Sequence, residues 1–233
     1  MTLVFCHCLE NRLIIVTDSL STDAHGNQKH APKCAAFPGK PVVVAWWGDQ
    51  NLEPKVLVDD PETVPINDKQ LAASSSIANK LPSPDHIWPC FSSAFLNALN
   101  QSEHVHNGNR GVAGLLMGVA VRNRIYAFIY EARTGGGSWQ MMTDKSGVNS
   151  WPQIFGDTTS LVEMLNSQNP RERENIASLA KTKTPDEFAG TAKRWIEQTE
   201  KFQKEHRRSV TVGMPAYTLT LNCNGHVAGV SAL

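Results

Sequence analysis

The residues best suited to chemistry stand at the start of the chain. The sequence opens MTLVF, so Thr2 directly follows Met1. If Met1 is removed, Thr2 carries a free α-amine beside its hydroxyl. A hydroxyl is a weak nucleophile at neutral pH, and the amine of the same residue can serve as its base. Thr2 is therefore a candidate catalytic nucleophile, and the alternative is an ordinary strand residue behind a retained methionine.

Two charged residues further along the chain could support such a nucleophile. Asp18 follows an apolar run in the segment IIVTDSLST, and Lys33 follows Asp18 across a loop. A lysine cation near Thr2 would lower the pKa of the hydroxyl and of the amine, and Asp18 would hold that cation in position. Lys29 competes with Lys33 for this role, and Asp18 could instead cap a turn. We favour the pair of Asp18 and Lys33.

Two further positions would complete a site for acyl transfer. Gly48 follows the run PVVVAWW and could present its backbone N–H to the oxyanion of an intermediate. Ser19 either caps a turn or lines the substrate cleft, and we favour the cleft. This chemistry requires no cofactor, so we expect none.

The cysteines offer weaker alternatives. Cys6, His7 and Cys8 carry metal-binding atoms, but on a strand the two sulfurs face one way and the imidazole the other. We therefore expect them to pack in a core, and we expect no metal site. Cys34 follows Lys33 and is either a reactive thiol with a lowered pKa or a small buried hydrophobic residue.

Composition limits the class of protein. The 233 residues are 41% hydrophobic, which is enough for one domain spanning residues 1–233. Lys plus Arg and Asp plus Glu both number 22, so a general attraction to nucleic acid or to an anionic membrane is not expected. The five cysteines fit no disulfide framework, and we expect neither a signal peptide nor a transmembrane span. We expect a soluble cytoplasmic protein.

Apolar patterns predict strands in two groups, with helices between and after them. The expected strands span residues 2–8, 12–18, 41–47, 111–121, 124–132, 138–143, 217–223 and 226–231. The expected helices span residues 70–81 and 87–99, a segment after Gly156, and a long stretch opened by Pro185. This order favours the α+β class, with two antiparallel sheets stacked face to face and helices outside, a four-layer αββα sandwich.

Several segments carry a family resemblance. The strings TLVF, LIIVTDSLST and VVVAWWGD, with a lysine at position 33, resemble the N-terminal third of proteasome β-type subunits and their bacterial relatives. These are N-terminal nucleophile hydrolases. The resemblance implies that fold for the whole chain and a threonine peptidase whose catalytic residues are Thr2, Asp18 and Lys33. It also implies unfolded polypeptides or peptides as substrates.

The chain departs from the family pattern at three places. Where the family has a small Ala-Gly-X-Ala-Ala-Asp segment, this chain reads AWWGD at residues 45–49, so that two indoles crowd the position. The serine-bearing glycine turn appears as Phe155-Gly156-Asp157, without the serine. The aspartate-containing loop near the C-terminus is replaced by TVGMP at residues 211–215. The residues that support Thr2 are therefore incomplete or rebuilt.

The resemblance also implies an assembly. Apolar helix faces carrying Trp88, Phe91, Phe95 and Trp195 cannot all turn inward in a chain of this size. By resemblance we expect a closed homo-oligomer, a double ring of roughly six or seven subunits per ring, to which an ATPase regulator could feed substrate. Two other functions stay open: a catalytically inactive subunit of the same fold, and an N-terminal nucleophile amidase that acts on a small amide.

Overall fold

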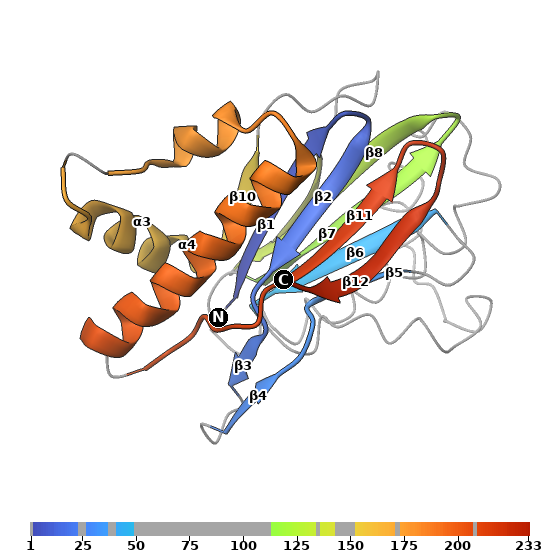
Figure 1. Ribbon diagram of the computed structural model, residues 1–233. Helices are drawn as coiled ribbons and strands as arrows, with labels where there is room; N and C mark the ends of the chain where they lie inside the picture. The colour runs from blue at the N-terminus through green and yellow to red at the C-terminus, as the bar shows by residue number, and fades with distance from the viewer. Residues whose placement is uncertain are drawn as a thin grey trace.

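Two five-stranded antiparallel sheets form the centre of the computed structural model (Figure 1). The structure describes residues 2–22, 27–36, 41–48, 113–133, 136–142, 152–170, 173–206 and 209–233. The strand order of the first sheet is β10-β1-β2-β11-β12, and that of the second is β5-β6-β7-β8-β9. A separate hairpin, β3–β4, extends from the end of β2.

The element bounds are as follows. The first sheet contains β1 (Leu3–Leu9), β2 (Arg12–Thr17), β10 (Gln153–Gly156), β11 (Tyr217–Asn222) and β12 (Val227–Ala232). The second sheet contains β5 (Cys34–Ala36), β6 (Val42–Trp47), β7 (Ala113–Val121), β8 (Arg124–Arg133) and β9 (Gly136–Met141). The hairpin consists of β3 (Leu20–Thr22) and β4 (Gln28–His30). The described helices are α3 (Thr158–Ser167), the 3₁₀ helix η4 (Ile176–Lys181) and α4 (Pro185–His206).

The two sheets pack face to face over an apolar core. Alternate residues of the strands point into it, because successive side chains of a strand face opposite sides. Trp47 at the end of β6 stacks on Phe155 of β10, with ring centroids 4.7 Å apart and an interplanar angle of 12°. A Cβ at Gly118 would lie 2.2 Å from Leu13 Cδ2, so a glycine in β7 lets the sheets approach closely.

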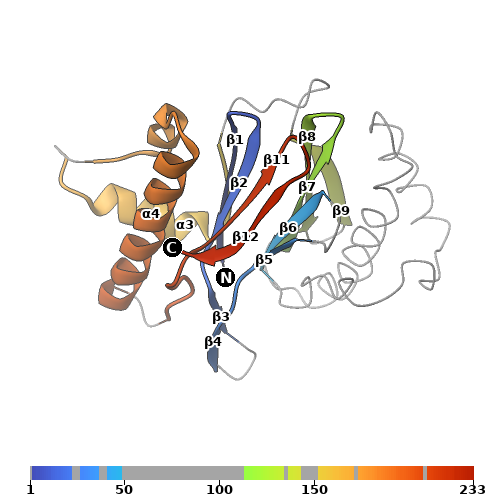
Figure 2. The same ribbon diagram turned by 45° about the vertical axis from the view of Figure 1, so that its right-hand side comes forward.

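The helices α3 and α4 cover the other face of the first sheet, as Figure 2 shows. A second apolar core lies between these helices and the first sheet. It contains the residues of β1 and β2 that face away from the second sheet. Phe5 meets Trp195 edge to face at 6.3 Å, and Phe188, Ala192 and Ile196 of α4 are buried in the same cluster. Because these α4 residues recur near every 3.6 positions, one helix face is apolar and lies on the sheet.

The α+β class with stacked antiparallel sheets and covering helices, expected from the sequence, is confirmed. The short strands β3, β4, β5 and β10 were not predicted, because three or four residues carry little periodicity. The helices expected at 70–81 and 87–99 lie outside the described residues, as do Trp88, Phe91 and Phe95. Trp195, one of the four aromatic residues that were not all expected to turn inward, is 0% exposed, because its indole packs against Phe5 of β1.

In the described parts of the chain, none of the helices combines the length and the apolar character that a bilayer crossing requires.

Candidate active site

Thr2, Asp18 and Lys33 meet at one end of the first sheet. Thr2 immediately precedes β1 and Asp18 immediately follows β2, and the antiparallel pairing of β1 with β2 brings these two ends together. Lys33 immediately precedes β5. Lys33 Nζ lies 2.5 Å from Thr2 Oγ1 and 3.2 Å from each carboxylate oxygen of Asp18. The three residues singled out by their chemistry thus form one contact network.

Asp18 accepts hydrogen bonds from the backbone on three sides. Its Oδ1 accepts the N–H of Leu3 at 2.9 Å, and its Oδ2 accepts the N–H groups of Leu20 at 3.1 Å and Gly213 at 3.2 Å. Burial raises the pKa of the Asp18 carboxyl, and Lys33 and the backbone donors oppose that shift. Because these neighbours are all donors, the environment suits a carboxylate.

Lys33 is surrounded by acceptors. It is 4% exposed, and its ammonium donates to Thr2 Oγ1, to Asp18 and to the carbonyl oxygen of Leu20. Three directions of donation match the three protons of an ammonium. Burial lowers the pKa of Lys33, and the Asp18 carboxylate opposes that shift. The site therefore holds a lysine that gives up its proton more readily than an exposed one.

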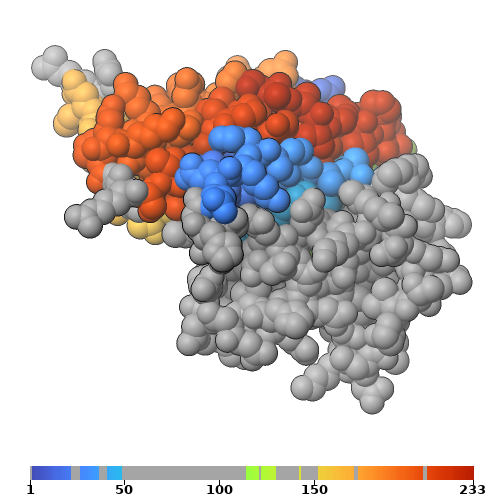
Figure 3. Space-filling view, turned by 90° about the horizontal axis from the view of Figure 1, so that it is seen from below, coloured from blue at the N-terminus to red at the C-terminus, as the bar shows by residue number. Residues whose placement is uncertain are grey.

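Lys29, the competing lysine, lies elsewhere. It is an exposed residue of β4, and its backbone pairs with Ser21 in the β3–β4 hairpin. On the face seen in Figure 3, the blue surface of the N-terminal segments adjoins the orange-to-red surface of the C-terminal part of the chain. The hydrogen bond from Gln28 Nε2 to the carbonyl of Val210, at 3.2 Å, joins the two. Lys33 is the lysine in contact with Thr2.

Ser19 is buried beside Asp18. Its N–H and hydroxyl both donate to the carbonyl oxygen of Gly213, at 3.0 and 3.3 Å, and its Oγ lies 3.0 Å from His30 Nδ1. These contacts tie the start of the β3–β4 hairpin to the segment that precedes β11.

Gly48 follows β6, and its φ of +88° is one that glycine adopts without strain. Two residues earlier, the N–H of Trp46 donates to the carbonyl of Lys33 at 3.0 Å, so this end of β6 runs beside the lysine. The expected crowding by two indoles is wrong for Trp47, which points into the core between the sheets. Because neighbours on a strand face opposite sides, Trp46 points away from that core.

A second polar group, which we call the helix-side cluster, consists of Asp157, Ser160, Gln203 and Thr211. The carboxylate of Asp157, which caps α3, accepts hydrogen bonds from the Ser160 N–H at 3.1 Å and from the hydroxyls of Ser160 and Thr211, both at 2.7 Å. Gln203 Nε2 lies 3.1 Å from the same carboxylate. Sequence reasoning missed this cluster. A glutamine four residues after Thr199, on the apolar face of the long helix, was the signal that could have revealed it.

The helix-side cluster touches Thr2 through the backbone. The N–H of Asp157 donates to the carbonyl oxygen of Thr2 at 2.7 Å. The preceding residue, Gly156, has a φ of +92°, and a Cβ there would lie 1.6 Å from the Thr2 oxygen. Only a glycine permits this approach. Gly156 and Asp157 therefore hold Thr2, and Gly213, in the segment 211–215, holds Asp18.

The other candidate groups are structural. Burial raises the pKa of the Cys34 thiol to about 12, so it is not a reactive thiolate. Cys6 lies in the core between the sheets, whereas the His7 ring faces Phe188 of α4, at a centroid distance of 5.5 Å. Over the residues that the structure describes, no group of three or more His, Cys, Asp or Glu side chains could hold a metal ion.

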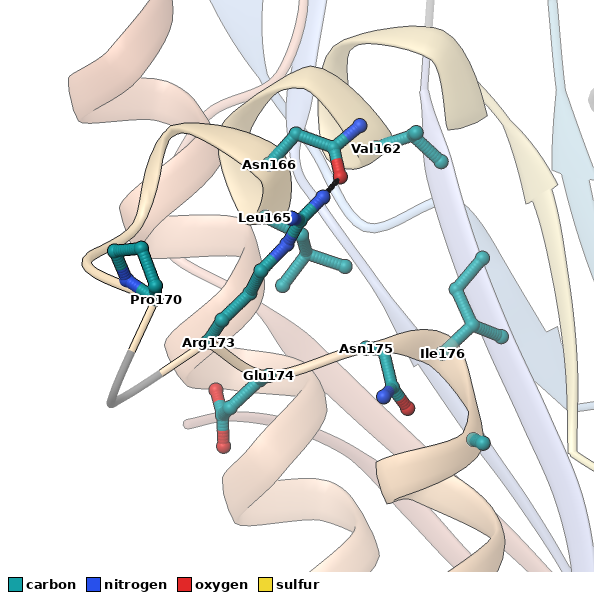
Figure 4. Close-up of a pocket in the computed structure, with 9 residues that line it drawn as sticks. Val162, Leu165, Asn166, Pro170, Arg173, Glu174, Asn175 and Ile176 are labelled. Atoms are coloured by element: carbon teal, nitrogen blue, oxygen red, sulfur yellow. Dashed lines mark hydrogen bonds between the residues drawn. The ribbon is translucent and has the colours of Figure 1, made fainter.

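A pocket of about 680 Å³ lies apart from Thr2, between α3 and the segment leading into η4 (Figure 4). Its polar lining includes Asn166 and Arg173, which are hydrogen-bonded to each other. Glu174 accepts from Trp195 Nε1 at 2.7 Å. None of the residues of the Thr2 network lines this pocket.

Solved structures of the same fold provide a comparison. Anbu (ancestral beta-subunit) from Yersinia bercovieri superposes with a TM-score of 0.52 at 12% identity, over 99% of this chain and 86% of that chain. The Anbu complex from Pseudomonas aeruginosa, solved as a helical assembly, superposes with a TM-score of 0.56 at 14% identity, over 99% of this chain and 86% of that chain. The Anbu (Gly-1) mutant from Hyphomicrobium sp. strain MC1 gives 0.50 at 12% identity, over 100% and 87%. The superpositions show a common fold, and at identities this low they show the fold alone.

Neither a protein-family model nor a curated protein sequence matches this chain.

The comparison corrects the family expected from the sequence. The resemblance to proteasome β-type subunits is wrong at the level of the family, because the similar structures are Anbu proteins, which are proteasome-like but distinct. The reason lies in the segments that carried the resemblance. They are β1, β2, β6 and the charged residues at their ends, which the stacked-sheet fold itself brings together. Such segments indicate the fold and do not separate families that share it.

Proposed function

We propose that this chain is a threonine-type N-terminal nucleophile hydrolase, which cleaves peptide bonds with the Thr2 hydroxyl after Met1 has been removed. The observation that carries this proposal is the 2.5 Å contact between Lys33 Nζ and Thr2 Oγ1. A buried ammonium at this distance stabilises negative charge on the attacking oxygen. Asp18, at 3.2 Å from Lys33 Nζ, holds the cation in place.

The reaction follows from these groups. As Thr2 Oγ1 attacks the carbonyl carbon, its proton passes to the free α-amine of Thr2. The C–N bond of the substrate then breaks, and the leaving amine takes that proton. Water hydrolyses the resulting ester and restores the hydroxyl. In this scheme Lys33 stabilises the charge that develops on Oγ1, and Asp18 orients Lys33. Gly48 offers a backbone N–H to the oxyanion. Ser19 is 0% exposed, so it supports the site from within through its bonds to Gly213 and does not line a cleft.

The direct test is acylation by a peptidyl β-lactone, read by intact mass. The wild-type protein should lack Met1 and gain the mass of one probe on Thr2. Thr2→Ala should fold normally by circular dichroism and take up no probe, whereas Thr2→Ser should be labelled more slowly. Full labelling of Thr2→Ala would remove Thr2 from the mechanism, and a retained Met1 in a labelled protein would remove the N-terminal amine.

We further propose that the chain self-associates. A head-to-tail contact makes a closed ring when its rotation closes and a helical filament when it does not. The Pseudomonas aeruginosa neighbour was solved as a helical assembly. The double ring expected from the sequence would instead require a contact whose rotation closes. Native mass spectrometry separates these outcomes: a ring gives one discrete mass, a filament gives a series that grows with concentration, and a single monomer mass contradicts self-association.

A further inference from the structure

Gln203 is a buried amide on the apolar face of α4. It is 0% exposed, and a buried amide is costly unless it is hydrogen-bonded. Its Nε2 lies 3.1 Å from Asp157 Oδ2, 3.0 Å from Ser160 Oγ and 2.7 Å from Thr211 Oγ1. Its Oε1 accepts the N–H groups of Thr211 at 2.9 Å and Val212 at 3.1 Å. Both ends of the amide are therefore occupied.

The segment that Gln203 holds, residues 211–213, is the one that holds Asp18. We call it the anchor loop. Gly213, which directly follows the two residues bonded to Gln203, donates its N–H to Asp18 Oδ2 at 3.2 Å. The carbonyl of Gly213 accepts the N–H of Ser19 at 3.0 Å. A displacement of the anchor loop would thus move the carboxylate that orients Lys33.

Gln203 also touches the second support of Thr2. Its Nε2 shares the carboxylate of Asp157 with the hydroxyl of Thr211, and the N–H of Asp157 donates to the Thr2 carbonyl at 2.7 Å. One route from Gln203 reaches Thr2 through Asp157. The other reaches it through the anchor loop, Asp18 and Lys33. Gln203 and its partner Thr211, which is itself part of the anchor loop, are common to both routes, and Gln203 is the member that comes from α4.

We infer that Gln203 is a positioning residue for Thr2, which sets the distance and alignment between the Thr2 hydroxyl and Lys33 by fixing Asp157 and the anchor loop. This inference rests on the proposed hydrolase function. A misplacement of about 1 Å can cost roughly a hundredfold in rate, so a residue far from the reacting atoms can still govern the reaction.

Thr199 provides a matched control. It lies one turn before Gln203 on α4, is also 0% exposed, and its hydroxyl has no hydrogen-bond partner among the described residues. Thr199→Val therefore removes a buried polar group from the same helix face without disturbing either route to Thr2. Gln203→Met removes the amide and keeps a side chain of similar length.

The first experiment compares acylation of these variants by a peptidyl β-lactone. For Gln203→Met we expect the limiting acylation rate to fall by about 10- to 100-fold, with the half-saturating probe concentration nearly unchanged. Thr199→Val should match the wild type in both. A folded Gln203→Met protein that behaves like Thr199→Val overturns the inference.

The variant Gln203→Glu tests the hydrogen-bond pattern itself. Its carboxyl still accepts from the anchor loop, but it donates to Asp157 only while protonated. Burial beside another carboxylate raises the pKa of such a group. We expect near-normal acylation at low pH and a new loss of rate as the pH rises through that pKa. A pH profile with no added ionisation overturns the inference, even if Gln203→Met fails to fold.

A second readout separates this inference from the proposed function. If the wild type takes up no probe, the hydrolase proposal fails, and the titration of the Lys33 amine, followed by NMR of labelled lysine, still tests the positioning. In Gln203→Met the loosened anchor loop admits water, so the pKa of Lys33 should rise toward its ordinary value. An unchanged Lys33 titration overturns the positioning role whatever the activity.

Discussion

Two buried aspartates, Asp18 and Asp157, support Thr2 in different ways. Asp18 is 0% exposed and Asp157 is 4% exposed. Asp18 binds the Lys33 ammonium, which in turn contacts the Thr2 hydroxyl. The side chain of Asp157 binds neutral donors from α3, α4 and the anchor loop, and its backbone N–H holds the Thr2 carbonyl. Asp18 therefore holds a charged group against the Thr2 hydroxyl, whereas Asp157 fixes the position of the Thr2 backbone. Loss of charge should cost more than loss of geometry.

The largest expected effect is the loss of the cation itself. Lys33→Ala removes the ammonium at Thr2 Oγ1, and we expect acylation by the β-lactone to slow by about a hundred- to ten-thousand-fold. Lys29→Ala is the control, because that lysine is exposed on β4, and it should remain within about twofold of the wild type, as surface substitutions usually do. The contrary result, an essential Lys29 and a dispensable Lys33, would mean that the observed contact has no role in the reaction.

Exchange of each aspartate for asparagine tests the comparison directly. Asp18→Asn leaves the buried Lys33 without its counter-charge, which costs about 3 to 5 kcal/mol of unfolding free energy. Asp157→Asn weakens the hydrogen bonds that neutral donors make to the carboxylate, which costs about 1 to 3 kcal/mol. Urea denaturation of both variants measures the difference, and acylation rates should fall in the same order. Equal losses would show that the two carboxylates do not differ in kind.

The glycines beside the two aspartates give a smaller test of the same contrast. Gly156→Ala forces a side chain into a φ of +92° and against the Thr2 carbonyl, so we expect a loss of about 3 kcal/mol. A Cβ at Gly213 would lie 2.9 Å from Leu20 Cβ, a milder overlap that should cost about 1 kcal/mol. Thermal unfolding ranks the two. A tolerated Gly156→Ala would mean that the turn can move away from Thr2.

A pH dependence that originates at Lys33 is the last expected effect. Because burial lowers the pKa of this lysine, the folded protein loses that proton at a pH where the unfolded chain still holds it. Between the lowered and the ordinary pKa, stability should rise with pH by up to about 1.4 kcal/mol per unit. Acylation should fall over the same range, as the ammonium disappears.

The control for the pH dependence is Lys33→Ala. In this variant the additional rise of stability with pH in the alkaline range should vanish. Denaturation midpoints of both proteins over a pH series provide the measurement. An identical slope in the two proteins would place the titrating group elsewhere.

The sequence predicts the Asp18 side of the site better than the Asp157 side. Thr2 and Asp18 stand at the two ends of one hairpin, so a local pattern of two apolar strands brings them together. The Asp157 side depends on β10 pairing with β1, with Gly156 opposite Leu3 across more than half of the chain. A strand of four residues gives almost no periodic signal.

The helix-side cluster shows why the Asp157 side of the site could not be predicted from the sequence. Gln203 lies at a helical spacing from Ile196 and Thr199. From the sequence alone, a single glutamine on such a face would be interpreted as a polar residue with no particular role. Its hydrogen-bond partners are Asp157 at the cap of α3, Ser160 in the first turn of α3 and Thr211 in the anchor loop. Only the tertiary structure brings these partners to the glutamine amide. Polar networks of this kind are specified by several distant segments at once.

If Thr2 is the nucleophile, its burial also sets an order of events during synthesis. Under the proposed function, a processing enzyme must reach the peptide bond before Thr2, yet Thr2 is 4% exposed once β1 lies between β10 and β2. That enzyme acts most readily on an N-terminus that has left the ribosome and has not yet been covered. Since β10 is translated well after β1, the time the ribosome needs to reach residues 153–156 is the interval available for maturation.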